Sequence, residues 1–153
     1  GTDLVAWQLR IAAGQRLDIT QDDIQIQGHA IECRINAENP QDDFKPAPGT
    51  IVKYKSPQSE GNEALRFDTH ITEGYRIPPY YDSMIGKLIV HGPTRQVAIE
   101  RMLHALEHTQ VEGVPTTIKL HQNILSHADF ISGQYDCQFL SDHMEQLLTP
   151  QEA

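Results

Sequence analysis

Hydrophobic and polar positions alternate over several short stretches in the first half of the chain, a pattern typical of half-buried β-strands. In the stretch Gly28–Ile35, we expect one face, which carries Ile31, Cys33 and Ile35, to contact the core. Three further strands are predicted at Thr50–Tyr54, Leu65–Ile71 and Lys87–Val90. The residues at 39–49 and 56–63 are polar and rich in turn formers, so they are expected to be a loop and a turn.

Apolar positions spaced three and four residues apart predict helices at the start of the chain and through its second half. Asp3 is placed to cap a first helix that ends near Ala13, with Gly14 as its stop. Thr94 is placed to cap a second helix, which the pattern extends to about Val111. Two more helices are predicted from Pro115 to about His127 and from Cys137 to Leu147. Strands followed by helices predict an α+β domain with a small antiparallel sheet.

The composition is that of a soluble globular protein, since 39% of the 153 residues are hydrophobic and 22% are charged. The formal net charge of −9 argues against nonspecific binding to nucleic acid or to an anionic membrane. No apolar run approaches the roughly 20 residues that cross a bilayer. The chain lacks a starting Met and a signal-peptide pattern, so we expect it to belong to a longer protein. Only two cysteines, Cys33 and Cys137, are present, which predicts a cytoplasmic protein, or a mitochondrial-matrix protein in a eukaryote.

Arg66 is the first candidate for chemistry. On an alternating strand, its side chain shares a face with Asp68 and His70. One interpretation is an exposed ion pair with Asp68, which contributes about 0–1 kcal/mol to stability, and spacing alone favours it. The other interpretation is a guanidinium directed at negative charge that develops on a substrate oxygen.

The segment Tyr75–Lys87 is the second candidate, because two consecutive prolines impose a rigid, extended entry to a pair of tyrosines. Rigid and irregular segments of this kind often surround a ligand or a partner. From the residue types alone we favour a structural interpretation, in which Tyr80 and Tyr81 pack against the sheet and Asp82 forms an ion pair with Lys87.

His104 and His108 match the H-x-x-E-H pattern of one group of zinc peptidases and could share a metal ion. A catalytic zinc ion needs a third protein ligand, and no downstream Glu stands in a comparable context. The other histidines are scattered along the sequence and suggest no cluster, so we expect no metal site. No Gly-rich motif for nucleotide phosphates is present, and we expect no tight binding of ATP by this chain alone.

Four segments, in family order, closely resemble the C-terminal domain of biotin carboxylase: Glu32–Glu38, Phe44–Ile51, Leu65–His70 and Tyr75–Lys87. The resemblance extends from Gly1 to about Leu148. It implies an α+β fold in which a small antiparallel sheet is followed by C-terminal helices and preceded by a helix of an ATP-grasp domain. The implied boundaries are 1–27 for the end of the ATP-grasp domain, 28–148 for the C-terminal domain and 149–153 for a tail.

Members of this family are ATP-dependent ligases that carboxylate biotin on a carrier protein, using ATP, Mg²⁺ and bicarbonate. The resemblance implies that Arg66 is the catalytic, biotin-binding Arg that holds the ureido oxygen of deprotonated biotin, and this reverses the preference for a surface ion pair. The groups that bind ATP, Mg²⁺ and bicarbonate belong mainly to the upstream ATP-grasp domain. The isolated chain is therefore expected to be inactive.

The resemblance also implies partners. They are the upstream ATP-grasp domain, a biotin carboxyl carrier domain and a carboxyltransferase of an acyl-CoA or pyruvate carboxylase, for example in fatty acid biosynthesis. The segment Val90–Arg95 resembles a subunit contact of dimeric members, so we expect His91 and Arg95 at a homodimer contact. The alternative is a catalytically silent module that uses the same fold for dimerisation or packing, and such a module has no need of Arg66.

Overall fold

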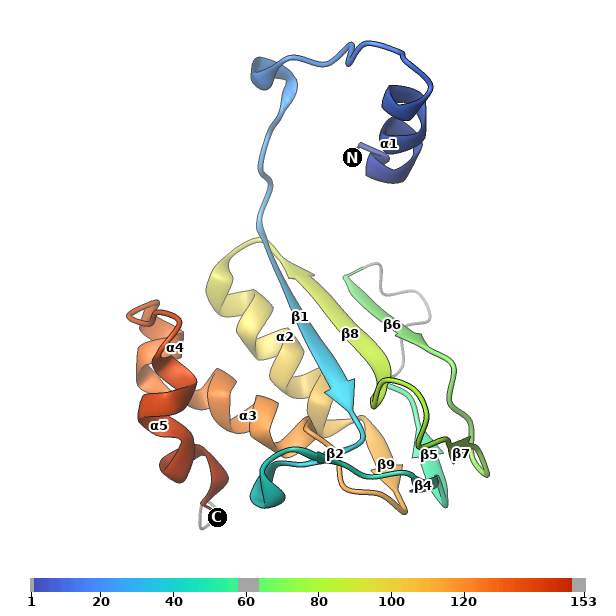
Figure 1. Cartoon of the computed structure of the whole chain (residues 1–153). Coiled ribbons are helices and arrows are strands. Elements are labelled where there is room, and N and C mark those ends of the chain that lie inside the picture. The colour runs from blue at the N-terminus through green and yellow to red at the C-terminus, as the bar shows by residue number, and fades with distance from the viewer. Residues whose placement is uncertain (1, 58–63, 150–153) are drawn as a thin grey trace.

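The structure, a computed structural model, describes residues 2–57 and 64–149. Most of the turn expected at 56–63, and all but the first residue of the tail expected at 149–153, lie outside the described residues. Within them the chain forms a three-stranded antiparallel sheet, three two-stranded ladders and five α-helices, which confirms the predicted α+β class (Figure 1). None of the helices in the described ranges has the length and apolar character needed to span a membrane.

The central sheet has the strand order β1–β8–β6, with β1 at His29–Asn36, β8 at Met84–Gly92 and β6 at Leu65–Thr69. In one cross-strand row, Cys33 pairs with Leu88, which pairs on its other side with Phe67. Cys33 and Leu88 are buried, as the alternation of apolar positions predicts. Strand β8 is longer than the predicted Lys87–Val90, because it pairs with a neighbouring strand on both sides.

Helix α2 (Arg95–Glu107) packs across the core face of β8 and β1 (Figure 1). Its first turn is capped as predicted, since the Thr94 hydroxyl accepts a hydrogen bond from the Val97 N–H. The prediction that this helix reaches Val111 is wrong. The helix ends at Glu107, and the following residues form β9 (Gln110–Glu112), which pairs with β5 (Lys53–Lys55).

The predicted strand Thr50–Tyr54 is also wrong, because the chain bends at Val52 and divides into two ladders. Strand β4 (Gly49–Thr50) pairs with β7 (Arg76–Ile77), whereas β5 pairs with β9. Gly113, which follows β9, has a φ of +105°, and a Cβ on it would lie 2.2 Å from the Thr50 carbonyl oxygen. Only a glycine therefore allows this close approach of the two backbones.

The loop expected between residues 39 and 49 contains a short ladder of β2 (Glu38–Asn39) with β3 (Lys45–Pro46). Two single-turn 3₁₀ helices occur at Gln21–Asp23 and Pro40–Asp42. Helix α1 (Leu4–Ala12) follows its prediction closely, because Asp3 caps it and Gly14 takes a positive φ after its end. None of its residues is buried, and α1 extends away from the sheet (Figure 1).

Three helices form a layer beside α2 at the C-terminal side: α3 (Ile118–Ser126), α4 (Ala128–Ser132) and α5 (Phe139–Leu148) (Figure 1). They bury a second, small apolar cluster that consists of Leu120, Phe139 and Leu147. Helix α3 begins three residues after the predicted start, and α4 was not predicted. This short helix lies between two others, and a single turn of five residues gives too little periodicity to detect.

Candidate functional site

The outer face of the central sheet, opposite α2, carries mostly charged side chains. The register places Arg66, Ile89 and Glu32 in one cross-strand row. The next row consists of Asp68, Lys87 and Arg34. We call these six residues the charged face. Because directly paired residues point to the same side of a sheet, strand pairing alone brings together charges that lie between 19 and 53 positions apart in the sequence.

Arg66 and Asp68 form a bidentate ion pair. The Arg66 Nε and Nη2 donate hydrogen bonds of 2.7 and 2.6 Å to the two carboxylate oxygens of Asp68. The ion pair predicted from the alternation is therefore confirmed. These hydrogen bonds lower the pKa of Asp68 and raise that of Arg66 from their ordinary values. The fork fixes the plane of the guanidinium, although 71% of the Arg66 side chain remains exposed.

Lys87 is a second partner of the same carboxylate, at 3.6 Å from Asp68 Oδ2. Arg66, Asp68 and Lys87 together carry a net charge of about +1, so this part of the charged face is positive. Sequence reasoning instead paired Lys87 with Asp82, and that prediction is wrong. Asp82 lies in the turn before β8 and accepts the Met84 N–H at 2.7 Å, whereas Lys87 points outward from β8 beside β6.

The two tyrosines of the second candidate segment do not pack against the sheet, so that structural interpretation is wrong. Tyr80 and Tyr81 are 86% and 81% exposed, because the segment after the prolines projects from the fold before β8 begins. Ser83 holds the end of this segment: its carbonyl accepts the Ala37 N–H at 2.8 Å, and its hydroxyl donates to Glu38. The end of the segment is thus held by hydrogen bonds, whereas its two tyrosine side chains are exposed.

His91 and Arg95, the expected dimer contacts, both make contacts within the chain. His91 lies at the exposed end of β8, with Nε2 2.8 Å from the Gln27 carbonyl oxygen. Arg95 begins α2, and its Nη1 donates to the Ile131 carbonyl at 3.1 Å. Its guanidinium also lies 4.8 Å from the ring centroid of Phe130. A role for these two residues between subunits stays a prediction.

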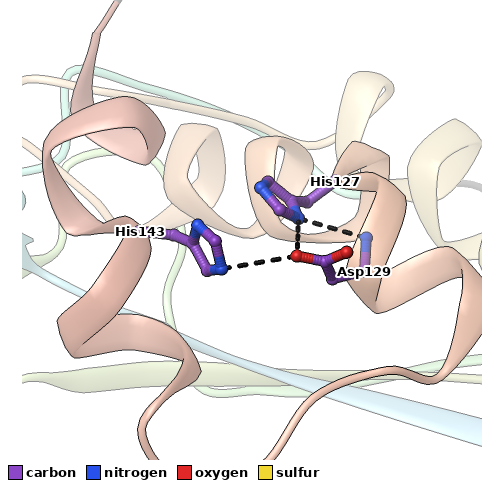
Figure 2. A group of neighbouring side chains, drawn as sticks. All are labelled: His127, Asp129 and His143. Carbon is purple, nitrogen blue, oxygen red and sulfur yellow. Dashed lines mark hydrogen bonds and ion pairs between the residues drawn. The ribbon is translucent and has the colours of Figure 1, made fainter.

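His104 and His108 lie one turn apart, and their rings stack with centroids 4.1 Å apart. The His108 Nδ1 is 2.8 Å from the His104 carbonyl oxygen, so that nitrogen is occupied by the helix backbone. The expectation that the remaining histidines form no cluster is wrong. Over residues 2–57 and 64–149, one group of three potential metal ligands converges, and it consists of His127, Asp129 and His143 (Figure 2).

Sequence comparison assigns most of the chain to one family. Residues 32–142 match the family model described as the biotin carboxylase C-terminal domain. The chain is 51% identical over 142 residues to a biotin carboxylase of Nostoc, covering 93% of this chain and 31% of that protein. It is 49% identical over 150 residues to a chloroplastic biotin carboxylase of Arabidopsis thaliana, covering 98% of this chain and 27% of that protein.

Structural comparison agrees with this assignment. The fold resembles the biotin carboxylase domain of the 2-oxoglutarate carboxylase of Hydrogenobacter thermophilus, with a TM-score of 0.86 and 44% identity. The match covers 98% of this chain and 32% of that one. That relative was solved as a dimer in complex with MgADP, ADP and bicarbonate. The chain therefore spans about a third of the length of the relatives that it matches.

Proposed function

Because this chain belongs to the biotin carboxylase C-terminal domain family, we propose that it forms one wall of a biotin carboxylase active site. The reaction is the ATP-dependent carboxylation of biotin by bicarbonate, with biotin carried on a partner protein or domain. The observation that carries the proposal is the fixed, exposed guanidinium of Arg66 on the charged face.

Arg66 suits the stabilisation of an oxyanion. Carboxylation of biotin requires loss of a proton from a ureido nitrogen, and the resulting negative charge is shared with the ureido oxygen. Arg66 has five N–H donors, and Asp68 takes two of them, which leaves three for a ligand within the described part of the chain. A charge-assisted hydrogen bond strengthens as the oxygen becomes negative, so the interaction favours the transition state over bound biotin.

Asp68 and Lys87 support this arrangement. The Asp68 carboxylate fixes the guanidinium plane before biotin arrives, which reduces the loss of rotamer freedom on binding. Its negative charge would oppose the oxyanion, but Lys87 at 3.6 Å offsets that charge. We therefore assign Arg66 the catalytic role, and Asp68 and Lys87 the role of positioning it.

ATP, Mg²⁺ and bicarbonate are assigned mainly to a neighbouring ATP-grasp domain. The charged face offers only Glu32 and Asp68 as carboxylates, in separate rows, and Asp68 is already paired with two cations. This donor set is a poor fit to Mg²⁺, which prefers free carboxylates in an octahedral arrangement. When bound next to this wall, MgATP would supply the energy and the phosphate for the carboxylation.

The first helix supports such a neighbour. Leu4, Val5 and Leu9 of α1 are 71%, 66% and 69% exposed, and α1 makes no buried contact. Exposed apolar positions on one short helix are typical of a surface that another element covers. We therefore propose that residues 1–27 complete an ATP-grasp domain, that residues 28–148 form the C-terminal domain, and that the parent protein is a homodimer.

The proposal is tested with the whole parent protein, incubated with MgATP, labelled bicarbonate and either free biotin or its biotinylated carrier. We expect label in carboxybiotin that depends on both ATP and biotin. The absence of labelled carboxybiotin from an ATP-cleaving parent protein would instead support the silent packing module. The 153-residue chain alone is expected to give no label.

A further inference from the structure

We propose that His127, Asp129 and His143 form a binding site for a divalent transition-metal ion, with Zn²⁺ as the best match. His127 lies at the junction of α3 and α4, Asp129 lies in the first turn of α4, and His143 lies in the middle of α5 (Figure 2). The site therefore joins two helices of the C-terminal layer. It uses none of the residues of the charged face, so it does not depend on the proposed function.

The distances fit a tetrahedral ion after small shifts of the side chains. Each of the three residues offers one ligand atom, and these atoms all lie within 4.8 Å of one another. The Asp129 Oδ2 is 3.4 Å from His143 Nε2 and 3.8 Å from His127 Nδ1. Ligand bonds of about 2.0–2.1 Å at tetrahedral angles place neighbouring ligand atoms roughly 3.3–3.4 Å apart. The pair of Asp129 with His143 already has this spacing, and the pair of Asp129 with His127 needs to close by about 0.4–0.5 Å. The two histidine nitrogens lie within 4.8 Å of each other and need to close by up to about 1.4–1.5 Å.

The ligand chemistry selects the class of ion. Two imidazoles and one carboxylate suit Zn²⁺ and its transition-metal neighbours, whereas Ca²⁺ and Mg²⁺ prefer oxygen ligands throughout. The side chains of His127, His143 and Asp129 are 11%, 30% and 45% exposed. The ligands are thus held partly within the protein, with solvent access for a water molecule at the fourth position.

The contacts of His127 leave its Nδ1 without a proton but already hydrogen-bonded. Its ring meets that of Phe139 edge-on, with centroids 5.2 Å apart. Its Nδ1 accepts the Asp129 backbone N–H at 3.2 Å, which requires that Nδ1 carry no proton. A metal ion needs this unprotonated nitrogen, but it must replace the N–H as the partner of its lone pair. We therefore expect moderate rather than very tight affinity.

The surroundings favour a cation. A shallow hollow of about 440 Å³ lies next to His143, and Asp136 and Asp142 line it. No Lys or Arg is among the residues that line this hollow in the described part of the chain. These two carboxylates share the hollow with His143 and raise the local concentration of a divalent ion on that side of the site.

The site is tested by calorimetric titration of the chain with Zn²⁺ under reducing conditions. We expect one ion per chain and a rise in Tm with added Zn²⁺. His143→Ala and Asp129→Asn should each weaken binding at least tenfold. Both positions are partly exposed, so each variant should keep its Tm in the absence of metal.

Two control variants separate this site from other metal-binding groups. His104→Ala removes the stacked pair on α2, and Cys137→Ser removes an exposed free thiol. Neither should change the affinity. Co²⁺ in place of Zn²⁺ should give the visible absorption of a tetrahedral complex, and His143→Ala should abolish it. Binding that survives both ligand variants, binding that is lost in either control, or no binding at all would overturn the proposal.

Discussion

Gly86 lies directly beneath the ring of Phe67, and we predict that Gly86→Ala destabilises the sheet that presents Arg66. A Cβ on Gly86 would lie 2.5 Å from Cε2 and 2.9 Å from Cζ of Phe67, and 3.2 Å from the Thr69 Cβ. Carbon atoms in contact are normally about 3.5–4.0 Å apart, so the ring must move by roughly 1 Å. Because Phe67 lies between Arg66 and Asp68 on β6, its movement also disturbs the ion pair.

The expected cost follows from overpacking. Inserting a methyl group into a packed site costs about 1–3 kcal/mol, and replacing glycine returns about 0.4–1 kcal/mol through the unfolded chain. We therefore expect Gly86→Ala to lower the free energy of unfolding by about 1–2 kcal/mol. In Phe67→Leu the ring is absent, so the added methyl group has room. The double variant should be more stable than the sum of the single changes predicts, by about 1 kcal/mol or more.

Urea unfolding followed by far-UV circular dichroism measures these free energies. Gly74→Ala is the matched control: its φ is +83°, but a Cβ there meets no atom within 4 Å. It should be destabilised by backbone strain alone, and Phe67→Leu should leave that cost unchanged. Strict additivity of Gly86→Ala and Phe67→Leu would refute the steric reasoning.

Three further predictions concern titratable groups and the expected dimer. Burial raises the pKa of the Cys33 thiol to about 12, so a thiol reagent at pH 8 should label only the exposed Cys137 until the chain is unfolded; fast labelling of two thiols in the folded chain would contradict this. Burial lowers the pKa of His121, so the unfolded chain binds more protons than the folded chain just below about pH 6.5. The free energy of unfolding should therefore decrease as the pH is lowered through this range. Urea unfolding at pH 7 and pH 5 should show a smaller fall in His121→Gln, and equal falls would argue against burial as the cause. In sedimentation of the parent protein, Arg95→Glu should weaken a dimer more than Arg101→Glu; its Tm must be measured too, because Arg95 also contacts Phe130.

The sequence predicted the parts of the fold whose signals are local. Alternation in Gly28–Ile35 identified β1 and its buried face, and Asp3 and Thr94 identified two helix starts. It failed where distant pairing overrides local pattern. Residues 110–112 continue a helical pattern, yet they form a strand because residues 53–55 offer them a ladder.

In the candidate sites, too, local contacts were predicted from the sequence and contacts between distant elements were not. The pair of Arg66 with Asp68 is two residues apart on one strand, so alternation alone predicted it. Lys87 as the second partner of Asp68 depends on the register of β8 against β6, which no local pattern supplies. Likewise, His127 and His143 come together only because α5 packs against α3, and 16 positions separate them in the sequence.

If Arg66 stabilises negative charge on biotin, the parent protein carrying Arg66→Ala should lose most of its activity. We expect kcat for biotin carboxylation to fall by about 10²–10³, with little change in KM for ATP. Arg66→Lys should recover little, because an ammonium group lacks the planar fork of donors. Arg76→Ala, at another exposed arginine, should keep normal turnover. The Tm of Arg66→Ala should stay nearly unchanged, since an exposed ion pair contributes about 0–1 kcal/mol. Near-normal turnover in a well-folded Arg66→Ala protein would contradict a catalytic role and leave Arg66 with only its ion pair to Asp68.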